Sequence, residues 1–159
     1  MIQHACFADT LLDAAKEVFE TMIFMDLQLC SEPGRRVDGE ALMATITFSN
    51  SIEGCLAVCT DTTCAEAIAI NMLGLEAGAD LSVEEVSDAI GEVANMVMGS
   101  IKSRLTDTYE GIQVSIPSVV RGRELVNSLG EKSGRVSVQV NLEDAHLMEI
   151  SLLYRESAK

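Results

Sequence analysis

The segment from Val83 to Thr106 constrains the fold most, because its pattern is that of one long amphipathic helix. Ser82 followed by Glu85 is a capping-box pattern, which predicts that the helix begins at Val83. With about 100° of rotation per residue, a set of apolar side chains falls within one arc. These are Val83, Val86, Ile90, Val93, Ala94, Val97, Ile101 and Leu105. We expect this arc to pack on a hydrophobic core.

The opposite side of this helix carries Glu84, Asp88, Glu92, Asn95, Gly99 and Lys102. Glu92 and Asn95 are three residues apart, so they are neighbours on the helix surface. A glycine in mid-helix costs about 1 kcal/mol, and Gly99 faces away from the core, so core packing does not require it. It would let a partner approach closely, and Met96 at the edge of this side would add an apolar contact. The wheel alone equally allows solvated side chains and a tolerated glycine.

The rest of the chain alternates between helical and strand patterns. Apolar periodicity predicts a first helix over 7–27. Residues 41–49 and 54–60 alternate as two strands around a hairpin turn. Asp61 is a predicted N-cap for a helix over 62–73, which Gly74 would end.

Strands are also predicted near 112–116 and 119–120, and a hairpin over 136–142 and 147–154. Hairpin-length connections join most strands, which favours antiparallel pairing. We therefore expect an α/β fold with a largely antiparallel sheet, flanked by two long helices and one shorter helix. The length of 159 residues is most simply one domain, 1–159.

Composition excludes several functions. The formal net charge of −14 argues against nucleic acid and anionic membrane surfaces, which require clustered Lys and Arg. No apolar run approaches the roughly 20 residues of a membrane span, and the first residues lack the pattern of a signal peptide. The five cysteines include no Cys-x-x-Cys pair, and the two histidines lie far in sequence from Cys55 and Cys59, so we expect reduced thiols in a cytoplasm and no metal site.

Two stretches resemble a known family. "SDAIGEVANMVMGSIKSRL" (87–105) and "VSIPSVVRGREL" (114–125) are similar to the CheC/CheX family of chemotaxis phosphatases. The family pattern is Asp or Ser, three residues, Glu, two residues, Asn, and a proline twenty-odd residues later. Asp88, Glu92, Asn95 and Pro117 match it. The predicted first helix contains no asparagine for a second such motif, so the resemblance is closest to CheX.

This resemblance implies hydrolysis of the phospho-aspartate of a CheY-like response regulator. The regulator would supply Mg²⁺ and a lysine, so the protein would need no cofactor of its own. Asn95 would orient the attacking water, as a carboxamide can both accept and donate hydrogen bonds. Glu92 would pair with the regulator's lysine, and Asp88, Met96 and Gly99 would contact the regulator. The resemblance also implies a homodimer formed through sheet edges.

Two alternatives remain at this stage. The chain could be a non-catalytic module of the same fold that docks on a response regulator or a flagellar switch component. The Glu92–Asn95 pair favours the enzyme, because docking alone does not require the carboxamide. Arg121 and Arg123 flank Gly122 and could clamp a phosphate, but solvated turn residues are the simpler interpretation.

Overall fold

A computed structural model describes residues 4–32, 36–127 and 133–156 of the chain. In these ranges the helices are α1 (His4–Val18), α2 (Thr62–Leu73) and α3 (Val83–Leu105), and α1 continues into a π-helical turn, η1 (Phe19–Ile23). The strands are β1 (Leu27–Leu29), β2 (Ala41–Ser49), β3 (Ile52–Asp61), β4 (Gln113–Val114), β5 (Ser118–Gly122), β6 (Gly134–Leu142) and β7 (His146–Glu156).

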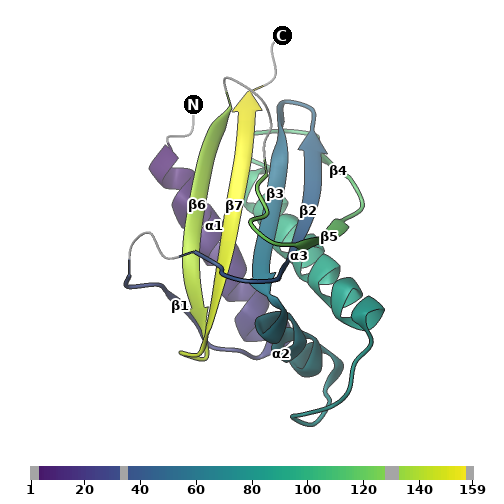
Figure 1. Ribbon diagram of the computed structural model, residues 1–159. Helices are drawn as coiled ribbons and strands as arrows, with labels where there is room; N and C mark the ends of the chain where they lie inside the picture. Colours follow the sequence, from purple (N-terminus) through teal and green to yellow (C-terminus); the bar gives the residue numbers. More distant parts are fainter. Residues whose placement is uncertain (1–3, 33–35, 128–132, 157–159) are drawn as a thin grey trace.

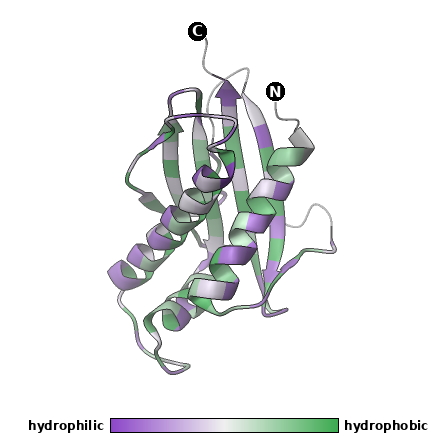
Figure 2. Ribbon diagram, turned by 180° about the vertical axis from the view of Figure 1, so that it is seen from behind, coloured by the Kyte–Doolittle hydropathy of each residue, from purple (hydrophilic) through white to green (hydrophobic). Residues whose placement is uncertain are grey.

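The strands form one sheet in the order β1-β6-β7-β3-β2-β4, and β5 also pairs with β2. All of these pairings are antiparallel. The three helices lie together on one face of the sheet, with α1 and α3 side by side and α2 near one end (Figures 1 and 2). The predicted fold class is therefore confirmed.

Local signals explain the turns between paired strands. Between β6 and β7, Glu143 and Asp144 have φ angles of 53° and 56°, and the Ala145 amide donates to the Leu142 carbonyl oxygen at 3.0 Å. Positive φ at two successive residues reverses the chain within a three-residue connection, across which Leu142 pairs with His146. This turn places the two long C-terminal strands in register.

The main core lies between the sheet and the helices. It combines side chains from α1 and α3, such as Leu11 and Ile90, with inward-facing strand residues such as Leu56 and Ile150. A smaller apolar cluster on the other face of the sheet joins Ala41, Met43, Ala57 and Cys59. Val37 and Leu125 pack against this cluster from the segments that precede β2 and follow β5, which cross the sheet in front (Figure 1).

The first helix differs from its prediction. The α-helix ends at Val18, the π-helical turn follows, and Phe24 adopts a left-handed conformation with φ of 62°. Residues 27–29 then pair with β6 instead of extending the helix. The helical period of apolar residues does continue through Ile23. The strand that follows is too short to show an alternating pattern in the sequence, because its pairing with a distant strand determines its conformation.

Two further predictions need correction. Val83, placed in the apolar arc of α3, is 53% exposed, because it occupies the first helical position, before the buried part of the helix begins at Val86. The strand expected near 112–116 is limited to Gln113–Val114, where it pairs with the end of β2. The other members of the α3 arc are buried as predicted.

Candidate functional site

Side-chain contacts engage helix α3 at both ends. At its start, the Glu85 amide donates to Ser82 Oγ at 3.1 Å and the Ser82 amide donates to Glu85 Oε1 at 3.1 Å, which completes the predicted capping box. Near its end, Arg104 forms an ion pair with Glu17 of α1, with 2.6 Å between Nη2 and Oε2. Together with the buried arc, these contacts hold the outer side of α3 in a defined position.

That outer side forms a ridge consisting of Asp88, Glu92, Asn95 and Gly99, all of which are exposed. Among the described residues, no hydrogen bond or ion pair engages the side chains of Asp88, Glu92 or Asn95. By contrast, Glu85 on the same helix is used by the cap. The carboxylate and carboxamide of the ridge are therefore available to a molecule that approaches from outside.

The glycines of α3 differ in their surroundings. A Cβ placed on Gly99 would have nothing within 4 Å, so the fold itself does not require glycine there. A Cβ placed on Gly91 would lie 3.4 Å from Val119 Cγ2 and 3.7 Å from Pro117 Cγ. Sequence reasoning singled out Gly99 and Pro117 but missed Gly91, which lets β5 and Pro117 pack closely against the flank of α3 beside Glu92.

A groove lies on each side of the ridge. The α2–α3 groove, of about 310 Å³, is lined by Met72, Leu73, Glu85, Asp88, Ala89 and Glu92. The α1–α3 groove, of about 360 Å³, includes Met22, Met96 and Gly99 in its lining. Met96 therefore lies at the edge of the ridge, as the helical wheel predicts. Sequence reasoning missed Leu73, whose signal is an apolar residue directly before a glycine C-cap.

The electrostatics of the ridge are acidic. Asp88 and Glu92 lie one helical turn apart, with no Lys or Arg among the described residues that line the α2–α3 groove. A partner that covers this surface must therefore offset negative charge with a cation of its own.

The remaining sequence candidates lie elsewhere. Arg121 of β5 forms an ion pair with Glu40, with 3.3 Å between Nη1 and Oε1, so its charge is already partly compensated. Arg123 is exposed in the segment that follows β5. The structure brings neither arginine together with the ridge residues in a shared groove. A phosphate clamp therefore gains no support.

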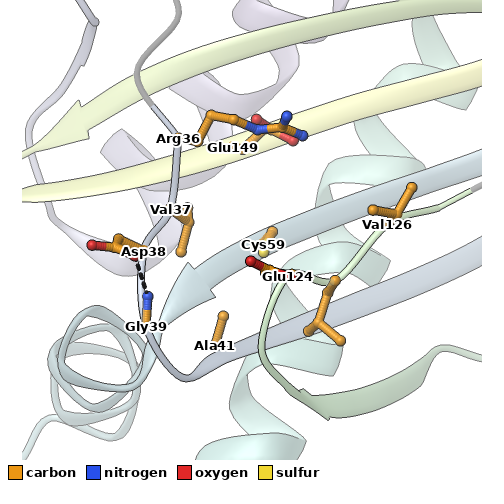
Figure 3. A pocket seen from close by; sticks show the side chains of 10 residues that line it. Arg36, Val37, Asp38, Gly39, Ala41, Cys59, Glu124, Val126 and Glu149 are labelled. Carbon is orange, nitrogen blue, oxygen red and sulfur yellow. Dashed lines mark hydrogen bonds between the residues drawn. The ribbon is translucent and has the colours of Figure 1, made fainter.

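A further cavity, of about 340 Å³, lies on the opposite face of the sheet (Figure 3). Arg36, Glu149 and Cys59 are among the residues that line it. Burial, with smaller effects from the Glu149 and Asp61 carboxylates, raises the pKa of the Cys59 thiol to about 11. Burial likewise raises the pKa of Cys64 to about 12, so both thiols stay protonated and weakly nucleophilic at neutral pH.

In the part of the chain that the structure describes, no group of three or more His, Cys, Asp or Glu side chains is arranged to hold a metal ion. None of the described helices combines the length and the apolar character needed to cross a membrane.

Comparisons with known proteins identify relatives. A family model described as "Chemotaxis phosphatase CheX" matches residues 42–141. The chemotaxis protein CheX from Vibrio vulnificus has a similar structure, with a TM-score of 0.78 and 24% identity, covering 98% of this chain and 100% of that one. A chemotaxis protein from Desulfovibrio vulgaris Hildenborough gives 0.78 and 23%, covering 97% of each chain.

The CheX–CheY–BeF₃–Mg²⁺ complex from Borrelia burgdorferi also contains a chain of this fold, with a TM-score of 0.73 and 21% identity, covering 98% of this chain and 100% of that one. No curated protein sequence matches significantly. At these identities, the structural matches establish the fold.

Proposed function

This chain belongs to the CheX family of chemotaxis phosphatases, and from that membership we propose that it hydrolyses the phospho-aspartate of a CheY-like response regulator. The observation that carries the proposal is the exposed pair Glu92 and Asn95, held on a rigid helix with no partner among the described residues. The family relative from Borrelia burgdorferi occurs in a complex with CheY, BeF₃ and Mg²⁺, which supports the choice of partner.

An acyl phosphate is already reactive, so the chemistry asks little of the enzyme. The oxygen of a water molecule attacks phosphorus, the bond between phosphorus and the aspartate oxygen breaks, and inorganic phosphate and the free carboxylate result. The regulator contributes Mg²⁺ and a lysine, which offset the negative charge. What the enzyme must add is a water held in line with the breaking bond.

Asn95 supplies that orientation. Its Oδ1 accepts a hydrogen bond from the attacking water, and its Nδ2 donates to an oxygen nearby in the regulator's site. Because the amide stays neutral, it adds no repulsion against the phosphoryl group. Glu92, on the adjacent position of the ridge, pairs with the regulator's lysine and thereby fixes Asn95 within the site.

Asp88, Met96 and Gly99 complete the contact surface. Asp88 attracts cations around the regulator's site, Met96 adds apolar area, and Gly99 leaves open space for a close approach. The net charge of −14 increases attraction to a cationic site but opposes an acidic one, so association should depend on ionic strength. We place this reaction in the cytoplasm.

The direct test mixes the chain with a CheY-like receiver domain that has been phosphorylated by acetyl phosphate. Release of inorganic phosphate is followed over time. We expect hydrolysis faster than the receiver's own rate, with catalytic turnover. Binding without acceleration would instead support the docking module of the same fold, and neither binding nor acceleration across several receivers would reject the proposal.

A homodimer through a sheet edge is a second expectation. Val114, Ile116 and Val120 are exposed on or between β4 and β5, and Ile116 is 85% exposed. Exposed apolar side chains beside an edge strand favour pairing with another chain. Light scattering should give twice the 17.1 kDa chain mass, and Ile116→Lys should shift the protein toward the monomer. A monomeric wild type at micromolar concentration would contradict this assembly.

A further inference from the structure

The α2–α3 groove combines apolar and acidic surface next to the ridge. Met72, Leu73 and Ala89 contribute its apolar part. Leu73 is 52% exposed at the last position of α2, where Gly74, with φ of 66°, ends the helix. An exposed apolar side chain beside a groove is stabilised when a partner covers it and removes its surface from water.

Two carboxylates in the acidic part of the groove can pair with a cation of a partner. Glu85 accepts from the Ser82 amide in the cap, whereas Asp88 and Glu92 have no partner in the described part of the chain. None of the lining residues that the structure describes is basic. A ligand that fills this groove must therefore pair an apolar group with positive charge.

Glu92 belongs both to this groove and to the ridge. Any partner that brings its phospho-aspartate to Asn95 consequently covers the groove as well. A ridge of four residues is also too small on its own, since specific interfaces bury roughly 800 Å² on each partner. The area beside the ridge must contribute.

The α1–α3 groove is a poorer match for such a contact. Its lining mixes hydroxyl side chains, Thr21, Ser100 and Ser103, with the apolar side chains of Val18, Met22 and Met96. Its carboxylate, Glu17, is already paired with Arg104. Charge complementarity therefore points to the α2–α3 groove.

We propose that the α2–α3 groove receives a segment of the response regulator in which an apolar side chain stands beside a Lys or Arg. The apolar side chain contacts Leu73 and Met72, and the cation lies near Asp88. This inference rests on the proposed function and adds a determinant of partner choice: a regulator that lacks this pair of residues beside its phosphorylation site is a poorer substrate.

The test uses Leu73→Ser, with Leu29→Ser as the matched control. Leu29 is a leucine of similar exposure, 56%, on β1 at the far edge of the sheet. We expect Leu73→Ser to raise KM for the phosphorylated receiver by at least about fivefold, with the loss in KM rather than in kcat. Leu29→Ser should match the wild type. Asp88→Lys should also raise KM and flatten its dependence on salt.

Three outcomes separate this inference from the proposed function. Hydrolysis by the wild type together with an unchanged KM for Leu73→Ser would overturn the groove and leave the phosphatase intact. In a second outcome, the wild type binds a BeF₃-loaded receiver tightly and Leu73→Ser weakens that binding, but the wild type does not hydrolyse the phosphorylated receiver. This outcome would support the groove and reject the phosphatase. A change in oligomeric state caused by Leu73→Ser would assign the groove to a second copy of the chain and overturn the inference.

Discussion

Replacing Asn95 by alanine is expected to lower the rate of phospho-aspartate hydrolysis at saturating regulator by at least about tenfold. The variant keeps the helix, the ridge and Glu92, but it loses the amide that orients the attacking water. A tenfold loss corresponds to about 1.4 kcal/mol of transition-state stabilisation, which is modest for a positioned water. Steady-state release of inorganic phosphate, with the phosphorylated regulator in excess over the enzyme, measures the effect.

The same substitution should not weaken the fold. The Asn95 side chain makes no hydrogen bond within the described part of the chain, and alanine favours a helix more than asparagine does. The thermal midpoint should therefore stay equal or rise while turnover falls. Asn141→Ala, on β6 in the sheet, is the matched control and should leave turnover unchanged.

Glu92→Ala should change KM as well as kcat, unlike Asn95→Ala. Losing the contact with the regulator's lysine weakens association, so KM should rise together with a fall in kcat. If both variants turn over regulator like the wild type, the assignment of the ridge as the catalytic surface is wrong. If the hydrolysis rate falls equally in both variants and returns to the wild-type rate when the regulator is saturating, the ridge contributes to docking rather than to catalysis.

The long helix could be predicted from sequence because its signals are local and agree with one another. The capping box sets its start, and the apolar arc runs through Ile90 and Val97, both fully buried. The opposite side then follows by geometry, so the exposure of Glu92 and Asn95 is also predictable. The hairpins follow in the same way, because alternation and turn residues act over a few positions.

What the sequence did not reveal depends on distant partners. β1 is a strand because Leu27 pairs with Leu142, more than a hundred residues away, and three residues carry no pattern of their own. The α2–α3 groove exists because Leu73 and Asp88, on separate helices, are brought together by packing on the sheet. The role of Gly91 likewise appears only when Pro117 is placed beside it.

Gly54→Ala is expected to cause a large loss of stability. Gly54 lies in β3, paired with Phe48 of β2 on one side and Tyr154 of β7 on the other. A Cβ placed there would overlap the backbone carbonyl oxygen of Leu153 and lie 2.6 Å from Phe48 Cζ. The aromatic ring could turn aside. The carbonyl, however, belongs to a strand that is hydrogen-bonded along its length, so moving this backbone would break hydrogen bonds of the sheet.

We expect the free energy of unfolding to fall by about 3 kcal/mol, the upper part of the range for overpacked cores. For a chain of this size, such a loss lowers the thermal midpoint by about 10 °C. Gly99→Ala is the matched control, because its Cβ meets nothing within 4 Å and a helical alanine should stabilise by about 1 kcal/mol. Calorimetry on the two variants therefore should show shifts of opposite sign from the same substitution. An equal, stabilising shift at both positions would mean that the strands accommodate the added methyl group, and it would contradict this account of Gly54.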